Sequence, residues 1–284
     1  MRDFDETNIT AAVLDRFTAT PDPRLKQIMQ SLVRHLHDFA RDVELTFEEW
    51  QYAIDYLTRT GRMCTDKRQE FILLSDTLGL SMLVDAINHR MPDGATETTV
   101  LGPFYVAGPP EFPLGADIAG SLPGEPLLVD GSVSGADGRP LAGAIVDVWQ
   151  ADRDGYYDVQ RPELETALLR ARFHTGADGK FSFKSVMPSF YPIPDDGPVG
   201  DMLQATARHP NRPAHIHFMI AAEGYQTLVT HVFAADSPYL DSDAVFGVKN
   251  SLIADFTRHD SGDGRMTGPF RFLTYDFGLK PSGK

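Results

Sequence analysis

Residues 127–149 read LLVDGSVSGADGRPLAGAIVDVW, and they divide into two β-prone runs joined by a turn. The runs at residues 127–133 and 144–149 each have the length of an ordinary strand. Ala136-Asp137-Gly138 between them is a turn sequence, because glycine adopts the positive φ that such turns need. The stretch therefore predicts two consecutive strands of an all-β unit.

Three more β-prone runs follow, at residues 179–185, 214–220 and 227–233. Glycine and proline become dense from about residue 93, and the turn sequence Ala177-Asp178-Gly179 leads into the first of these runs. Short strands at this spacing favour a β-sandwich over a fold that alternates strands and helices.

The chain before residue 93 has helical periodicity instead. Asp22 is a good N-cap, and Pro23 suits the first turn of a helix. Apolar residues then recur at intervals of three and four, as on one face of an amphipathic helix. They are Leu25, Ile28, Met29, Leu32, Val33, Leu36 and Phe39.

Two further helical segments are expected. Residues 46–49 (TFEE) form a capping box, and the helix that they open should end near Gly61. Residues 71–87 are apolar and helical in pattern, with an interruption at Gly79 and an end before Pro92. The prediction is an α+β chain, with a helical region over residues 1–95 and an all-β sandwich over residues 96–284.

Composition limits the kind of protein. The 284 residues include 40 acidic and 26 basic side chains, and this net charge of -14 argues against nucleic acid as the main partner. Cys64 is the single cysteine, which excludes an internal disulfide and any cysteine-rich metal site. No apolar run approaches the ~20 residues of a membrane-spanning helix, and the start MRDFDETNIT is no secretory signal. A soluble, cytoplasmic protein without membrane insertion is expected.

His215 and His217 are candidate metal ligands. Side chains two apart on a strand share a face, so the two imidazoles should lie close together. Two histidines on a solvated strand face could also be accidental. His35 and His37 lie on a predicted helix, where residues two apart diverge, and they are interpreted as exposed polar positions.

The residues alone leave the metal open. A two-histidine iron or zinc site usually takes a carboxylate as third ligand, and Glu223 is a candidate, although the pattern matches cupins poorly. Tyr157 and Tyr191 follow strands at turns, and a phenolate ligand requires a strong Lewis acid such as ferric iron, because free tyrosine has a pKa near 10. Most tyrosines in β proteins merely pack.

Four segments resemble motifs of the intradiol ring-cleavage dioxygenases. Residues 147–152 (DVWQAD) with 155–157 (GYY) resemble the first-tyrosine motif, and residues 188–191 (PSFY) resemble the second. Residues 212–218 (RPAHIHF) are similar to the two-histidine motif, and residues 101–105 (LGPFY) to the segment lining the substrate pocket. The resemblance covers nearly the whole chain.

The resemblance implies one Fe(III) per subunit, held by Tyr157, Tyr191, His215 and His217. It also implies that Tyr191 dissociates to accept a substrate proton, while Arg212 stabilises negative charge on the bound ring. The alternative for Arg212 is an ordinary surface arginine paired with a carboxylate. The family uses its helical region to form homodimers and often binds a phospholipid there, whereas the apolar helical stripe by itself is equally consistent with intramolecular core.

Residues 191–194 (YPIP) and 195–200 (DDGPVG) are most similar to hydroxyquinol 1,2-dioxygenases. The implied reaction is intradiol cleavage of benzene-1,2,4-triol by O2 to 3-hydroxy-cis,cis-muconate, in aromatic compound catabolism, with chlorocatechol and catechol as alternative substrates. Asp76 could bind the third hydroxyl, or it could be a helix-surface or capping group. The expected pocket residues are Leu73, Asp76, Val100, Gly102, Pro103, Phe104, Ile193, Pro194, Arg212 and Val245.

His231 departs from the family pattern, because many catechol-cleaving relatives have glutamine at this position near the active site, and the departure bears on hydrogen bonding to the substrate. Two competing hypotheses stay open: a colourless two-histidine, one-carboxylate metal enzyme, and a transthyretin-like sandwich that only binds ligands, suggested by residues 136–149.

Overall fold

The structure is a computed structural model that describes residues 2–65, 68–161, 163–164 and 166–283. The chain divides into two compact units, Met1–Arg62 and Met63–Lys284. The boundary expected between residues 95 and 96 stays a prediction; it lies in the irregular segment between the last N-terminal helix and the first strand. Within the described residues, no helix combines the length and the apolar character needed to cross a membrane.

The first unit is helical, with α1 (Ile9–Arg16), α2 (Pro23–Asp42) and most of α3 (Phe47–Met63). As predicted, the Asp22 carboxylate caps α2 by accepting from the backbone N–H groups of Arg24 and Leu25, at 2.7 and 3.1 Å. Thr46 and Glu49 form the predicted capping box reciprocally, at 2.9 and 3.2 Å. α3 extends two residues beyond Gly61.

Helix α1 was not predicted, and its packing corrects one interpretation. The hydroxyl of Thr10 on α1 lies 2.9 Å from the His37 ring on α2, so His37 is half-buried rather than an exposed polar position. His35 is exposed, as expected.

The second unit begins with α4 (Glu70–Thr77) and α5 (Leu80–Asn88). Gly79 separates them with a φ of +73°, which explains the predicted interruption. Helix α6 (Pro198–Ala205), which follows Gly197 and carries proline in its first turn, was not predicted.

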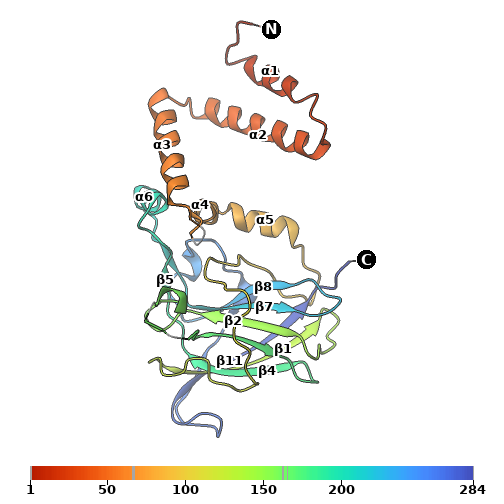
Figure 1. Ribbon diagram of the computed structural model, residues 1–284, viewed down its shortest axis with the longest axis vertical. Coiled ribbons are helices and arrows are strands. Elements are labelled where there is room, and N and C mark those ends of the chain that lie inside the picture. The colour runs from red at the N-terminus through yellow and green to blue at the C-terminus, as the bar shows by residue number, and fades with distance from the viewer. Residues whose placement is uncertain (1, 66–67, 162, 165, 284) are drawn as a thin grey trace. The chain divides into compact units, whose positions relative to one another are not determined.

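Two sheets form the rest of the second unit. The strands are β1 (Pro126–Gly135), β2 (Ile145–Gln150), β3 (Arg170–His174), β4 (Lys180–Val186), β5 (Tyr191–Pro192), β6 (Asn211–Arg212), β7 (His215–Ala221), β8 (Leu228–Ala234), β9 (Ile253–Ala254), β10 (Thr257–His259) and β11 (Phe270–Leu279). One sheet has the order β10-β11-β1-β4 and the other the order β3-β2-β7-β8-β9, while β5 and β6 pair separately. Figure 1 shows β2, β7 and β8 stacked on β1, β4 and β11, the predicted sandwich and α+β class.

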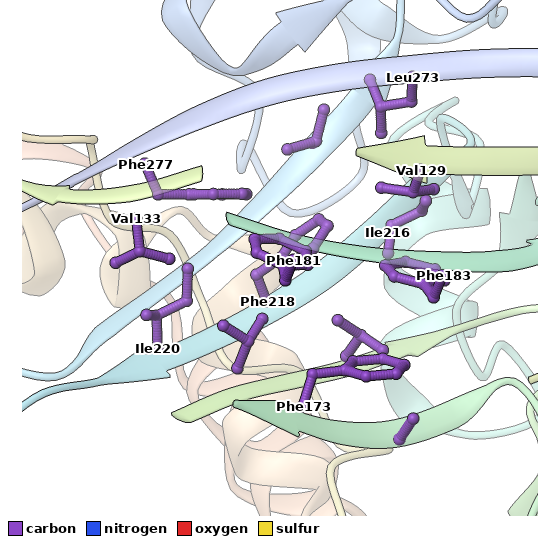
Figure 2. Close-up of a cluster of buried hydrophobic side chains, with 14 of the residues drawn as sticks. Val129, Val133, Phe173, Phe181, Phe183, Ile216, Phe218, Ile220, Leu273 and Phe277 are labelled. Atoms are coloured by element: carbon purple, nitrogen blue, oxygen red, sulfur yellow. The ribbon is translucent and has the colours of Figure 1, made fainter. Parts of the chain in front are cut away.

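The core lies between the two sheets. Figure 2 shows Phe181 among side chains of both layers, including Phe218 from β7 and Phe277 from β11. The Phe181 ring packs directly over Gly131, where an added Cβ would lie 2.3 Å from its Cζ. The glycine in the first predicted strand therefore makes room for a core aromatic ring.

The five predicted strands are confirmed as β1, β2, β4, β7 and β8, but the long strands β3 and β11 were missed. Strand β3 reads RARFH, and its two arginines conceal the alternation of apolar and polar residues that marks a strand. Both arginines are ion-paired with aspartates of the same unit. Arg170 pairs with Asp158, and Arg172 pairs with Asp147. Charge on alternate positions of this strand thus marks its second, outward face rather than a loop.

Strand register places one row of side chains on the face of the five-stranded sheet that points away from the core. Trp149 pairs with Arg170 on one side and His217 on the other, and His217 pairs with His231. Residues opposite one another on neighbouring strands share a face. The neighbours Val148, Ile216 and Phe218 point into the core instead.

Candidate metal centre

Four predicted ligands converge above the outer face of the five-stranded sheet. The Tyr157 hydroxyl lies 2.8 Å from His217 Nε2 and 3.1 Å from the Tyr191 hydroxyl. The Tyr191 hydroxyl is 3.5 Å from His215 Nε2, which is 3.1 Å from His217 Nε2. All four side chains are buried. Two phenols and two imidazoles therefore surround one point.

Tyr157 is held by the turn that precedes it and by the ring of Phe104. The Asp152 carboxylate accepts from the backbone N–H groups of Asp154 and Tyr156 and from Arg161, at 2.8, 3.0 and 2.6 Å. The Phe104 ring stacks on the Tyr157 ring, with centroids 4.3 Å apart. The turn fixes the backbone of Tyr157 and the stacking fixes its ring, and together they fix the position of its hydroxyl.

Tyr191 lies on β5, directly opposite Arg212 on β6. Gly155 approaches this strand so closely that an added Cβ would lie 2.9 Å from the Cβ of Tyr191. Gly155 also has a φ of +86°, which favours glycine. The glycine of the first-tyrosine motif thus allows the two tyrosine segments to come together.

His215 presents an unprotonated nitrogen to this point. Its Nδ1 lies 2.7 Å from the carbonyl oxygen of Pro213, and because a carbonyl only accepts, the Nδ1–H must donate. Burial, and then the charge of Arg212, lowers the pKa of His215 to about 3, so the ring is neutral at neutral pH. The lone pair is therefore on Nε2, the atom that faces the tyrosines.

A third imidazole joins the pair. His215, His217 and His231 each offer a ring nitrogen, and these atoms lie within 4.8 Å of one another. Burial lowers the pKa of both His217 and His231 well below 6.5. The family resemblance had already singled out His231, as the position where many relatives have glutamine, and the register of two adjacent strands places it opposite His217.

Arg212 is buried beside the cluster rather than on the surface. Its Nε and Nη2 donate to the Asp243 carboxylate at 3.0 and 3.2 Å, and its Nη1 lies 3.4 Å from His215 Nε2. Asp243 also accepts from the Gly247 N–H at 2.9 Å. Sequence reasoning missed Asp243, because a lone aspartate in an irregular segment carries no pattern that links it to residue 212.

The expected pocket residues fall into two groups around the ligands. Leu73, Val100, Ile193 and Val245 belong to one apolar cluster. Gly102 and Phe104 contact the ligands: a Cβ added to Gly102 would lie 3.2 Å from the Cε1 of His217. Pro194 is half-buried and Pro103 is exposed.

Asp76 is buried next to this cluster rather than exposed on its helix. Burial raises the pKa of the Asp76 carboxyl, partly opposed by the Ser81 hydroxyl and by the charge of Arg212. Asp76 lies on α4, the helix that also carries Leu73 of the apolar cluster. A carboxylate kept in an apolar environment is a common mark of a binding or catalytic group.

The carboxylate alternative for the third ligand finds no support in the described residues. Glu223 is exposed in the turn between β7 and β8, and the group of close potential ligands contains histidines alone. A surface hollow of about 480 Å³ is lined by Arg208, His209, Asp243 and other residues. None of the expected pocket residues lines it, although Asp243 is the ion-pair partner of one of them, Arg212.

The protonation state of Tyr157 indicates which kind of ion the site would hold. Burial, and then the neighbouring Tyr191, raises the pKa of Tyr157 well above 10.0. The phenol therefore stays protonated at neutral pH unless a strongly Lewis-acidic ion displaces the proton. A donor set of two phenols and two imidazoles without a carboxylate fits a trivalent ion better than zinc or magnesium.

Comparison with known proteins identifies relatives over the whole chain. Residues 100–281 match the family described as Dioxygenase, and residues 22–96 match the family described as Catechol dioxygenase N terminus. The chain is 58% identical to the 6-chlorohydroxyquinol 1,2-dioxygenase of Cupriavidus pinatubonensis, over 99% of this chain and 100% of the relative. It is 51% identical to the hydroxyquinol 1,2-dioxygenase of a Rhizobium species, over 97% and 96% of the two chains. The solved structure of hydroxyquinol 1,2-dioxygenase from Pseudomonas putida DLL-E4 matches with a TM-score of 0.93 and 51% identity, covering 98% and 99% of the two chains.

The Arg212–Asp243 pair predicts a large effect of Asp243→Ala on stability. Removing one partner of a buried ion pair costs about 3–5 kcal/mol, because the other charge is left buried and unpaired. Asp130→Ala, which breaks the largely exposed pair with Arg265, is the control and should cost less than about 1 kcal/mol. Urea unfolding at neutral pH measures both; similar small losses for the two variants would contradict the buried pair.

The loss of stability in Asp243→Ala should depend on pH. Burial opposes ionisation of Asp243, but the charge and hydrogen bonds of Arg212 outweigh it and lower the pKa of this carboxyl below 3.8. The stabilisation is thus present above the unfolded-state pKa of about 3.9 and is lost as the pH falls through the lower folded-state pKa. The difference between the wild-type protein and Asp243→Ala should therefore shrink in acid.

Proposed function

The chain belongs to the intradiol ring-cleavage dioxygenases, and we propose that it cleaves hydroxyquinol with O2 at a non-haem Fe(III) held by Tyr157, Tyr191, His215 and His217. The product would be 3-hydroxy-cis,cis-muconate, a step in the catabolism of aromatic compounds. The observation that carries the proposal is the convergence of two phenol oxygens and two imidazole nitrogens on one buried point. The high identity to relatives named for hydroxyquinol and its 6-chloro derivative supports the substrate.

The spacing of the four donors fits a shared ion. Metal–nitrogen bonds of about 2.0–2.1 Å put adjacent ligand atoms about 3 Å apart. The contacts between the tyrosine hydroxyls and the Nε2 atoms fall between 2.8 and 3.5 Å. His215 already directs its lone pair inward, and Tyr157 needs a Lewis acid to ionise. One such Fe(III) per subunit would draw electron density from a bound catecholate and make its ring carbon reactive toward O2.

The protein residues would divide the proton transfers and the charge between them. Tyr157 is held by the Asp152 turn and by Phe104, so it suits a ligand that stays bound. Tyr191 lies on the two-residue strand β5 and is slightly less buried, which suits a ligand that dissociates and takes a substrate proton at its hydroxyl oxygen. Arg212, fixed by Asp243, would stabilise negative charge on the substrate through a preorganised cation.

Replacing Tyr157 by phenylalanine tests the iron site. The wild-type protein with Fe(III) should be red-brown, because tyrosinate-to-iron charge transfer absorbs visible light, and Tyr157→Phe should lose most of that band together with activity. Tyr156→Phe is the matched control, because the neighbouring tyrosine is exposed and should change neither. Visible absorption and oxygen uptake give the two readings. A colourless wild-type protein that binds iron would refute the four-ligand site and revive the carboxylate alternative.

Asp76 is proposed to select the substrate. Its carboxylate is buried on α4, the helix that carries Leu73, where it could accept a hydrogen bond from the third hydroxyl of hydroxyquinol. Catechol lacks that hydroxyl and would leave the buried carboxylate without this hydrogen bond. Sites that hydrogen-bond a substrate hydroxyl discriminate strongly against analogues without it.

Asp76→Asn should therefore reduce the preference for hydroxyquinol over catechol, by about 10–100-fold in the ratio of kcat/KM values. Asp93→Asn, an exposed aspartate of the same unit, is the control. Oxygen uptake with hydroxyquinol, catechol and chlorocatechol side by side measures the ratios. If the wild-type protein prefers catechol, the substrate assignment fails while the family stands.

The same variant should gain stability. Since burial raises the pKa of Asp76, the folded state favours the protonated carboxyl, and stability is lost as the pH rises through the folded-state pKa. Asparagine removes this penalty, so Asp76→Asn should melt above the wild-type protein at neutral pH and lose that advantage in acid. Thermal unfolding at both pH values decides it.

A homodimer is proposed from the apolar face of α2. In the described chain no residue of this helix is buried, and its apolar side chains are about half exposed. A second copy, with a phospholipid between the apolar faces, would remove this surface from water. We also propose a cytoplasmic location, which the single cysteine favours and cell fractionation would check.

Leu32→Glu should weaken or abolish the dimer, because it introduces a charge into the apolar face, whereas Arg34→Glu on the polar face should leave it intact. Sedimentation equilibrium reports the mass of each variant. Mass spectrometry of an organic extract shows whether lipid accompanies the protein. A monomeric wild-type protein at micromolar concentration would refute the proposal.

A further inference from the structure

The two histidine ligands are oriented by different means. The Nδ1–H of His215 donates to the Pro213 carbonyl at 2.7 Å, which fixes the tilt of the ring. Nδ1 of His217 is equally buried, yet within the described part of the chain it has no hydrogen-bond partner. Metal-binding histidines usually depend on a hydrogen bond at the second nitrogen for their orientation. Another contact must therefore fix the ring of His217.

Trp149 provides that contact. Its ring stacks on the His217 ring with centroids 4.6 Å apart and an interplanar angle of 13°. The two residues are direct cross-strand partners on β2 and β7, and each is only 1% exposed. A flat indole face against the imidazole restricts rotation of the ring about its Cβ–Cγ bond, because the ring cannot turn without striking it.

The other sides of the ring are closed as well. The backbone of Gly102 comes so near that an added Cβ would lie 3.2 Å from the His217 Cε1, and its φ of +76° favours glycine there. The ring of His231 meets His217 at 78°, with centroids 4.1 Å apart. Trp149 is the single partner that lies parallel to the imidazole among these contacts.

The indole is itself braced from the edge of the sheet. The Tyr105 ring packs against Trp149, with centroids 4.9 Å apart, and its hydroxyl donates to Asp147 Oδ2 at 3.1 Å. Asp147 is 1% exposed and accepts from Arg172 at 2.6 and 2.8 Å. A continuous set of contacts therefore runs from the Arg172 ion pair to the proposed metal ligand.

We propose that Trp149 is a positioning residue for the metal centre: its indole face holds the His217 imidazole in the orientation that a hydrogen bond provides for His215. This inference rests on the proposed function, because it assumes that His217 Nε2 binds the iron. Under this proposal Trp149 acts through His217, on which it stacks.

The test compares two replacements of Trp149 in the iron-loaded protein. Trp149→Met keeps apolar volume but has no ring, whereas Trp149→Phe keeps a flat face. Trp149→Met should lose iron to a chelator about 10–100-fold faster than the wild-type protein and shift its visible band. Trp149→Phe should keep the rate of iron loss within about threefold of the wild-type value and leave the visible band in place. Trp50→Phe, at the other tryptophan, should change neither the rate nor the band.

Melting of the iron-free proteins separates positioning from folding. If iron-free Trp149→Met melts as the wild-type protein does, faster iron loss with a shifted band supports the proposal, and unchanged iron loss with an unchanged band overturns it. If Trp149→Met does not fold, the decision passes to Tyr105→Phe, which removes only the hydroxyl that anchors the Tyr105 ring to Asp147. Severalfold faster iron loss in that variant supports the proposal, and wild-type behaviour overturns it. A wild-type protein without the visible band would instead refute the proposed function.

Discussion

Side-chain alternation along β7 is the constraint on which the rest of the structure depends. Because successive residues of a strand point to opposite faces, Ile216 and Phe218 enter the sandwich core while His215 and His217 point away from it. A shift of one residue in register would bury the imidazoles in the core and expose the apolar residues. Hydrophobic packing between the sheets therefore also fixes the geometry of the candidate metal centre.

The site above this face combines burial with few compensating charges. Burial keeps the histidines neutral and Tyr157 protonated. An ion that binds the Tyr157 oxygen must therefore be a strong enough Lewis acid to displace the phenol proton. The positive charge of Arg212 is tolerated there only because Asp243 accompanies it into the interior. Such an arrangement is costly for folding and useful for chemistry, since charges act strongly where water is excluded.

Segments outside the two large sheets contribute the two tyrosines of the site. Tyr157 follows a turn and Tyr191 lies on the two-residue strand β5, and each is tied to a neighbouring strand: the Tyr157 segment to β3 through the Asp158–Arg170 pair, and β5 to β6 by strand pairing. Glycines at positions 102 and 155 let these segments approach closely. Trp149 and Tyr105 then connect His217 to the edge of the sheet. Rigid strands with short, anchored connections explain how four candidate ligands from distant parts of the chain meet.

The sequence by itself determined the local features: the capped helices α2 and α3, the glycine break before α5, five of the strands, and the four motif residues that would bind iron. These depend on periodicity, turn chemistry and motifs, all of which operate over a few neighbouring residues. Strands β3 and β11, the Asp243 partner of Arg212 and the stacking of Trp149 on His217 were decided only by tertiary structure. The physical reason is that each depends on pairing or contact between residues far apart in the chain, and no local pattern encodes which distant partner a side chain will meet.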